Sequence, residues 1–170
     1  LGDHLNIWCY ARVDSVRRPD LLEKARRAGC RWVALGIEAA DSTVRDGQDK
    51  DFSDAQIVKT VRAIQDAGIH VIGNFIMGLP GDTEDSMRRT LELALDLRCE
   101  WANVYPAMAF PGSQLYRDAV AKHLRLPETW AGYAPLGYDC VPLATTTLTS
   151  EEVLAFRDRH TGEAEEAREL

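Results

Sequence analysis

The sequence has no cysteines at short spacing. Its four cysteines, Cys9, Cys30, Cys99 and Cys140, stand far apart, so no pair matches a zinc knuckle or a dithiol redox motif. We therefore expect no metal site within this chain. The cysteines are interpreted as small apolar side chains of a protein in a reducing compartment.

Long apolar runs and a surplus of positive charge are also lacking, and we expect no secretory leader. No stretch approaches the ~20 apolar residues that cross a bilayer, and residues 1–4 show no basic region before an apolar one. We predict a cytoplasmic protein with no membrane partner. Twenty Lys and Arg against twenty-seven Asp and Glu give a formal net charge of −7, which opposes phosphate backbones and argues against nucleic acid as a partner.

What the sequence does contain is a repeated pattern of short apolar runs. They are apolar on both faces, which is typical of strands buried in a parallel sheet, and they span residues 5–11, 31–37, 69–77 and 101–108. Helix start and stop signals mark the segments between and after them: Pro19 to Gly29, Ser53 to Gly68, Thr83 onward, Ser113 to His123, and Thr149 onward. Residues 127–147, rich in proline and glycine, are predicted to form an ordered loop.

Strand, helix and strand alternate at roughly thirty-residue spacing, which is typical of right-handed βαβ units. Such units build either a barrel or an open doubly wound sheet. No glycine fingerprint of a dinucleotide-binding turn follows any run, so we favour the barrel. The predicted fold class is α/β, with residues 1–125 forming part of a TIM-type barrel and residues 126–170 forming an ordered loop and helix packed on it.

Polar residues stand at the ends of the apolar runs, where a parallel barrel binds its ligand. Arg12 and Asp14 follow the first run, Glu38 follows the second, and Asn74 lies inside the third. A guanidinium can hold both oxygens of an α-amino-acid carboxylate, and a carboxylate can accept hydrogen bonds from ribose hydroxyls. Two plainer interpretations stay open: an ordinary surface pair of Arg12 with Asp14, and a mere tight turn at residues 78–81.

Three stretches, taken in order, resemble the radical S-adenosylmethionine (SAM) superfamily, and in particular its branch whose members often carry a cobalamin-binding domain. They are Cys-Tyr-Ala-Arg-Val-Asp at 9–14, Leu-Gly-Ile-Glu at 35–38, and above all Gly-Asn-Phe-Ile-Met-Gly-Leu-Pro-Gly-Asp-Thr-Glu at 73–84. Residues 111–116 resemble the family's segment after the sixth strand, and residues 127–157 are similar to the tail of that branch. The resemblance implies a partial six-stranded barrel, of which this chain would supply about strands three to six with their helices.

The resemblance also implies a role for each matching residue. Arg12 would lie near the SAM carboxylate, Glu38 near the ribose, and Asn74 within the same SAM site. Adenine would lie beside the backbone of two segments, which contain Ile76, Met77 and Gly78 in the first and Tyr105 to Met108 in the second.

One part of the family's pattern is absent. The family holds a [4Fe–4S] cluster on a C-x3-C-x2-C loop, and no cysteines here have that spacing. We therefore expect this chain to be a SAM-binding segment, inactive alone, whose open sheet edge associates with a missing N-terminal part of the barrel. With the cluster, the whole enzyme would form a 5′-deoxyadenosyl radical that attacks a small-molecule substrate, and cobalamin would require another domain.

Two other classes of protein stay open. A non-catalytic α/β module would use the chain only for contact with another domain. A barrel lyase or aldolase would place a lysine at a strand end to form a Schiff base, but none of the four runs ends in one, and Lys50 lies in the loop after Glu38.

Overall fold

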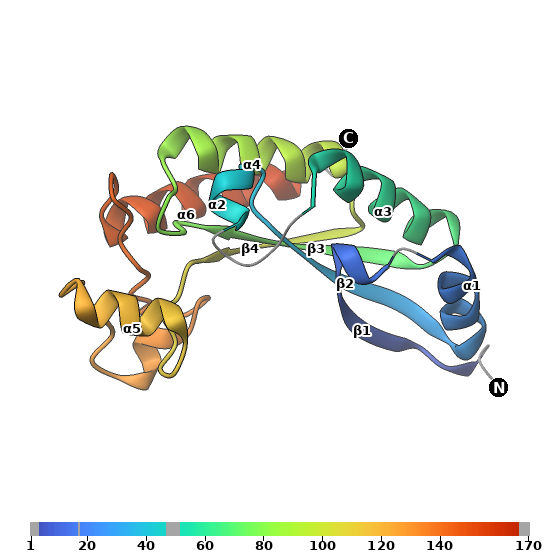
Figure 1. Ribbon diagram of the computed structural model, residues 1–170, viewed down its shortest axis with the longest axis horizontal. Helices are drawn as coiled ribbons and strands as arrows, with labels where there is room; N and C mark the ends of the chain where they lie inside the picture. Colours follow the sequence, from blue (N-terminus) through green and yellow to red (C-terminus); the bar gives the residue numbers. More distant parts are fainter. Residues whose placement is uncertain (1–3, 17, 47–51, 167–170) are drawn as a thin grey trace. The chain divides into compact units, whose positions relative to one another are not determined.

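Strands and helices alternate along the chain in the computed structural model, which describes residues 4–16, 18–46 and 52–166 (Figure 1). The strands are β1 (Ile7–Arg12), β2 (Cys30–Glu38), β3 (His70–Met77) and β4 (Trp101–Pro106). The α-helices are α1 (Pro19–Ala28), α2 (Ser42–Asp46), α3 (Asp54–Asp66), α4 (Glu84–Leu97), α5 (Gln114–Ala121) and α6 (Ser150–Glu166). Two short 3-10 helices are η2 (Val13–Ser15) and η3 (Trp130–Tyr133).

One parallel sheet in the order β1-β2-β3-β4 carries the fold, so each strand lies beside the next one in the sequence. The predicted α/β class is confirmed. The chain divides into two compact units, the first comprising Leu1–Phe75 with Glu92–Asn103 and the second Ile76–Leu91 with Val104–Leu170. The expected domain boundary between residues 125 and 126 stays a prediction.

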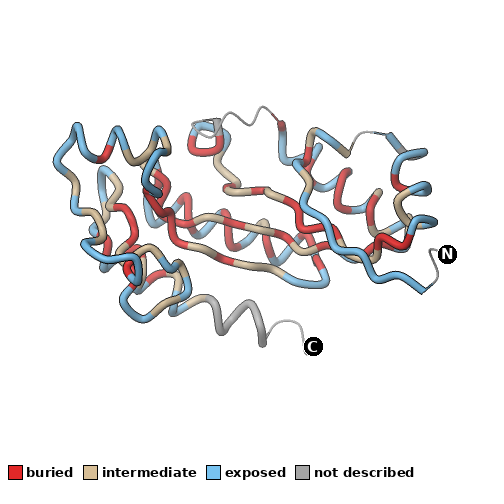
Figure 2. The backbone as a smooth tube through the Cα atoms, turned by 90° about the horizontal axis from the view of Figure 1, so that it is seen from below, coloured by how far each residue is buried: buried red, intermediate tan, exposed pale blue. Residues whose placement is uncertain are grey.

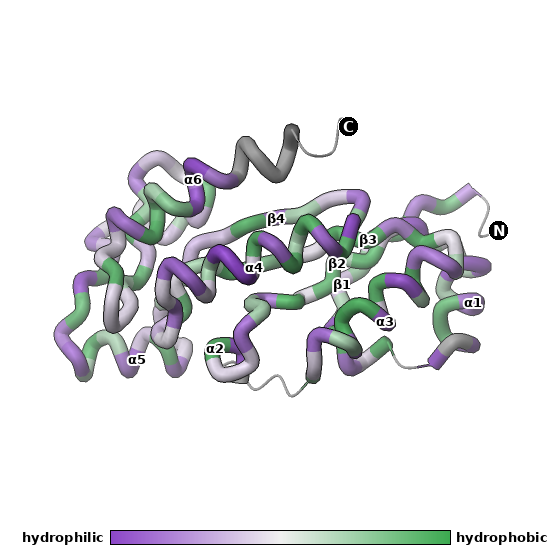
Figure 3. The backbone as a smooth tube through the Cα atoms, turned by 90° about the horizontal axis from the view of Figure 1, so that it is seen from above, coloured by the Kyte–Doolittle hydropathy of each residue, from purple (hydrophilic) through white to green (hydrophobic). Residues whose placement is uncertain are grey.

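The core of the first unit lies where helices pack on alternate residues of β2 and β3. α3 begins with a capping box, in which Ser53 Oγ accepts from Gln56 N (3.3 Å) and Gln56 Oε1 accepts from Ser53 N (2.7 Å). Its hydrophobic and hydrophilic residues alternate around the turns (Figure 3), and its apolar stripe is buried against the strands. The buried residues of this cluster include Val33, Leu35, Ile37, Ile57, Val61, Ile64, Val71 and Phe75.

The first strand differs from expectation. Ile7, Trp8 and Tyr10 are 41%, 53% and 75% exposed, and Figure 2 shows exposed residues along this strand near the N-terminus. The predicted burial of this run is wrong, because β1 lies at the edge of the sheet and has β2 as its only neighbour among the described strands.

The second unit has its own core, which α6 helps to cover. α6 begins after a capping box formed by Thr149 and Glu152, as predicted, and it buries Val153 completely. Residues 127–147 form a loop that contains η3, which confirms the irregular segment expected there. The larger buried cluster consists of Met77, Met87, Leu91, Val104 and Phe156. No helix in the described part of the chain is long and apolar enough to cross a membrane.

Candidate functional site

A polar row crosses the sheet of the first unit near the carboxyl ends of its strands. Arg12 of β1 pairs in register with Gly36 of β2, and Gly36 pairs with Asn74 of β3. Residues in register across parallel strands point to the same face of the sheet. Arg12 and Asn74 therefore share one face, with a residue that has no side chain between them.

Glu38 ends β2 with an unusual backbone. Its φ is +70°, and Ala39 N donates to Ile37 O at 3.1 Å, so Glu38 occupies the centre of a γ-turn of the strained, positive-φ form. The pairing of β2 with β3 shifts register at the same point, between Gly36 and Glu38. For a residue with a Cβ this conformation costs about 1–2 kcal/mol.

Two other non-glycine residues in the described chain have positive φ, but their settings differ. Arg98 and His123 have φ of +49° and +53° and lie just past the ends of α4 and α5, where left-handed residues are common. Glu38 instead follows a buried strand. Strain of this kind, held at the carboxyl end of a strand, is typical of functional positions.

Arg12 forms an ion pair with Asp14, as the interpretation of these two residues as an ordinary surface pair predicted. Its Nε and Nη2 donate to Oδ1 and Oδ2 of Asp14, each at 3.0 Å. The two side chains are 47% and 28% exposed, and a pair exposed to this degree contributes at most about 1 kcal/mol. The role of Arg12 toward SAM stays a prediction.

Asn74 belongs to a chain of polar side chains on the same unit. Asn103 Nδ2 donates to Asn74 Oδ1 at 3.0 Å, and Trp101 Nε1 donates to Asn103 Oδ1 at 2.9 Å. The expectation that Asn74 faces a polar group is confirmed. Its Nδ2 donates to no other described residue, which leaves this amide able to bind a ligand oxygen. Asn103 was missed by the sequence reasoning, although a second asparagine inside an apolar run is a usable signal.

The turn at residues 78–81 is organised by a buried carboxylate, that of Asp82. Its Oδ2 accepts from Gly78 N (3.0 Å) and Leu79 N (2.9 Å), and its Oδ1 accepts from Ser86 Oγ (2.6 Å). Asp82 is only 1% exposed. Hydrogen bonds to the Asp82 side chain thus hold the turn in place. The positions of glycine and proline in the sequence do not predict these bonds.

The residues expected beside adenine lie in the second unit. Ile76 and Tyr105 are half-buried strand residues, and Met77 and Met108 are buried. Met77 O accepts from Ala107 N at 2.8 Å, and Met108 O accepts from Phe110 N at 3.1 Å. Several backbone groups of these segments therefore already bond within the protein, and their contacts with adenine stay predictions.

The surroundings of Gly78 leave no room for a side chain, so a substitution there tests how closely the turn packs against Val153. The φ of Gly78 is +81° and an added Cβ would lie 2.5 Å from Val153 Cγ1, whereas Gly112 has a similar φ of +89° and no atom within 4 Å of an added Cβ. We expect Gly78→Ala to lower the free energy of unfolding by about 2–4 kcal/mol and Gly112→Ala by about 1 kcal/mol. Urea unfolding followed by circular dichroism measures both, and equal losses would show that contact with Val153 does not matter.

The cysteines do not form a cluster site. Cys9 Sγ and Cys30 Sγ are 3.7 Å apart, and burial, followed by the neighbouring Cys9, raises the pKa of the Cys30 thiol to about 11. Burial also raises the pKa of Cys140. Iron binds the thiolate form, which these shifts disfavour. Among the described residues, no group of three His, Cys, Asp or Glu side chains converges as metal ligands, so the residues present do not fit an iron–sulfur cluster.

Residues 5–94 match the protein-family model described as the radical SAM superfamily. An uncharacterized methyltransferase of Pyrococcus horikoshii is 29% identical over 111 residues, which cover 65% of this chain and 24% of that protein. The anaerobic magnesium-protoporphyrin IX monomethyl ester cyclase of Cereibacter sphaeroides is 30% identical over 119 residues, covering 69% of this chain and 19% of the cyclase. The chain thus spans about a quarter or less of the length of these relatives.

Solved structures show the same fold. Coproporphyrinogen III oxidase of Escherichia coli, a radical SAM enzyme, matches with a TM-score of 0.68 at 13% identity, covering 95% of this chain and 32% of the oxidase. The radical SAM methyltransferase TsrM of Kitasatospora setae, with cobalamin and a [4Fe-4S] cluster bound, matches with a TM-score of 0.56 at 18% identity, covering 62% of this chain and 21% of TsrM. At such identities the likeness concerns the fold alone, and it agrees with the partial barrel predicted from the sequence.

Proposed function

Because this chain belongs to the radical SAM superfamily, we propose that it supplies SAM-binding strands of a radical SAM enzyme whose [4Fe–4S] cluster is held by residues outside these 170. The observation that carries the proposal is the strained turn at Glu38. It lies at the carboxyl end of β2, just beyond the row that contains Arg12 and Asn74, where a register shift pairs Glu38 with Phe75. A parallel barrel places its ligand at this end of its strands.

Each residue of this group has a definite part in the proposal. Glu38 accepts hydrogen bonds from the ribose hydroxyls, which are donors suited to a carboxylate. Arg12 leaves Asp14 to grip the carboxylate of SAM with both arms of its guanidinium. Asn74 donates to SAM through Nδ2, an atom that makes no hydrogen bond to any described residue. The segments 76–78 and 105–108 lie beside adenine.

The remaining cofactors and partners come from elsewhere in this proposal. The cluster would be held by residues outside this chain and would supply the electron for cleavage of SAM into methionine and a 5′-deoxyadenosyl radical. Cobalamin, if the enzyme uses it, would be bound by another domain. The exposed edge of β1, a strand that carries the exposed side chains of Trp8 and Tyr10, associates with the cluster-binding segment. We propose a small-molecule substrate and a cytoplasmic location.

Iron content and SAM cleavage test the proposal together. After anaerobic reconstitution, these 170 residues alone should hold no stoichiometric iron, since no cysteine trio converges in the described structure. The complete enzyme, meaning this chain together with its cluster-binding segment, should hold about four irons per cluster and release 5′-deoxyadenosine when reduced in the presence of SAM. Iron analysis, a visible spectrum and chromatography provide the measurements. A four-iron cluster on this chain alone would overturn the assignment of the ligands, and a complete enzyme without SAM cleavage would favour a non-catalytic module.

A further inference from the structure

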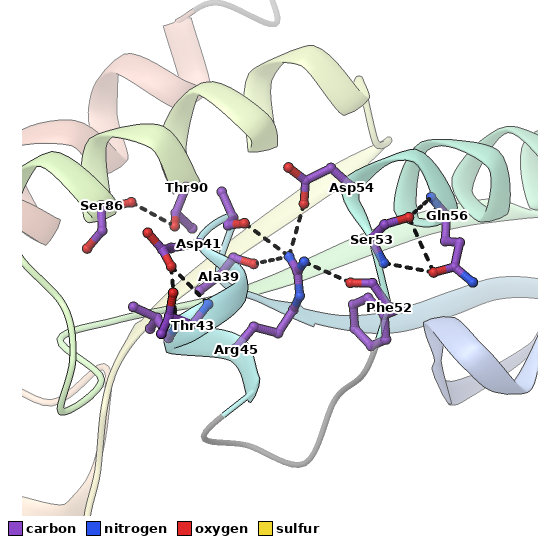
Figure 4. Close-up of polar contacts among 12 residues, drawn as sticks. Ala39, Asp41, Thr43, Arg45, Phe52, Ser53, Asp54, Gln56, Ser86 and Thr90 are labelled. Carbon is purple, nitrogen blue, oxygen red and sulfur yellow. Dashed lines mark hydrogen bonds and ion pairs between the residues drawn. The ribbon is translucent and has the colours of Figure 1, made fainter.

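Arg45 of α2 is a buried cation at the loop that follows Glu38 (Figure 4). Only 1% of it is exposed. Its Nη1 donates to Ala39 O (2.7 Å) and Ala40 O (3.2 Å), and its Nη2 donates to Phe52 O (2.8 Å). The guanidinium also lies 5.1 Å from the centre of the Phe52 ring. One side chain thus joins the end of β2 to the residue just before the cap of α3.

Burying an arginine here costs more free energy than burying an apolar residue would. The carboxylate that pairs with Arg45, that of Asp54 at 3.2 Å, has a side chain that is 60% exposed. Arg45 Nε has no hydrogen-bond partner among the described residues. Removing a guanidinium from water costs several kcal/mol unless its partners are good, and an apolar residue of the same volume avoids that cost. What Arg45 adds instead is a fixed position for three backbone carbonyls.

Two of those carbonyls belong to the residues that directly follow the strained turn. Ala39 N closes the γ-turn across Glu38, and the carbonyls of Ala39 and Ala40 are the next groups along the chain. A left-handed glutamate relaxes toward extended backbone unless its surroundings prevent it. The hydrogen bonds of Arg45 hold the chain on the far side of the turn, and the pairing of β2 with β3 holds the near side.

We propose that Arg45 is a positioning residue that keeps the Glu38 carboxylate aimed at its ligand. The inference rests on the proposed function, in which that ligand is the ribose of SAM. Arg45 touches no ligand atom itself; it acts through the backbone at residues 39 and 40.

Arg45→Lys in the complete enzyme tests this proposal. Lysine keeps the charge but cannot reach three carbonyls with one ammonium group, because it lacks the planar fork of arginine. We expect about a tenfold weaker affinity for SAM, since a small displacement of a ligand-binding group is costly. Isothermal titration calorimetry gives the affinity and a thermal melt of the same sample gives the stability. The matched control is Arg26→Lys, which also removes an arginine from a backbone carbonyl, Gly68 O at 2.9 Å, but near the amino end of β3; its SAM affinity should stay within about twofold of the wild type.

A double variant separates positioning from general stability. In the Glu38→Gln background the carboxylate is gone, so Arg45→Lys should weaken SAM binding by less than about threefold further. An equal loss in both backgrounds, or a lowered melting temperature with unchanged SAM affinity, would overturn the inference. If Arg45→Lys does not fold, Asp54→Asn loosens the same guanidinium from its exposed side and should cost about threefold in affinity; unchanged affinity in that variant would equally overturn it.

The failure of the proposed function gives a different pattern. A wild-type complete enzyme that binds no SAM, or a Glu38→Gln variant that binds it as well as the wild type, removes the ribose role of Glu38 and this inference with it. Suppose instead that the wild type binds SAM and Glu38→Gln weakens binding as expected, but Arg45→Lys has no effect. The proposed function then stands, and only the positioning role of Arg45 is overturned.

Discussion

Glu38→Gln is expected to weaken SAM binding by the complete enzyme roughly ten- to a hundredfold while leaving its fold intact. Glutamine has the shape of glutamate, so the change replaces a charge-assisted hydrogen bond to the ribose by a neutral one. It also keeps the same backbone strain, because both residues carry a Cβ at φ +70°. Calorimetry measures the affinity, and the unfolding free energy should change by less than about 1 kcal/mol.

Glu38→Gly separates the side chain from the backbone at this position. Glycine adopts positive φ without a steric cost, so this variant should gain up to about 1 kcal/mol of stability while losing SAM binding at least as severely as Glu38→Gln. Glu92→Gln, an exposed change on α4, serves as the control for the loss of one negative charge. Unchanged SAM binding with a lowered melting temperature in Glu38→Gln would make Glu38 a structural residue.

Asp82→Ala is expected to cause the largest loss of stability, about 3–5 kcal/mol of unfolding free energy. The substitution leaves two buried backbone donors, Gly78 N and Leu79 N, without their acceptor, and each buried donor without a partner costs about 1–3 kcal/mol. Ser86 Oγ loses its bond to Asp82 but can still donate to Thr83 O at 3.0 Å. Urea unfolding with circular dichroism measures the loss. The turn at residues 78–81 should then open, and Gly78 should lose its positive φ of +81°.

Two further substitutions give this prediction its controls. Asp82→Asn retains one carbonyl oxygen as an acceptor and should lose roughly half as much stability as Asp82→Ala. Asp118→Ala removes an aspartate that accepts a hydrogen bond from Gln114 at an exposed position of α5, and it should change stability by about 0.5 kcal/mol or less. A loss in Asp82→Ala no larger than that in Asp118→Ala would show that the carboxylate does not organise the turn.

Local chemistry allowed much of this fold to be predicted from the sequence. α3 follows from its capping box and from Ile57, Val61 and Ile64 at helical spacing, all interactions between residues close in the chain. Gly29 ends α1 with φ +105°, which glycine adopts without strain. The short helix α2 was missed, because five residues are too few to show a period.

The sequence by itself determined which residues stand at the carboxyl ends of the strands. The reason is that apolar runs and helix signals are patterns among residues close together in the chain. Only the tertiary structure decided their surroundings. The exposure of β1 depends on which strands lie beside it, and the bond between Asn103 and Asn74 depends on how β3 and β4 are placed in the sheet. The left-handed turn at Glu38 depends on Arg45 and on a register shift against β3. Such features arise from contacts between segments distant in sequence, and local propensity carries no information about them.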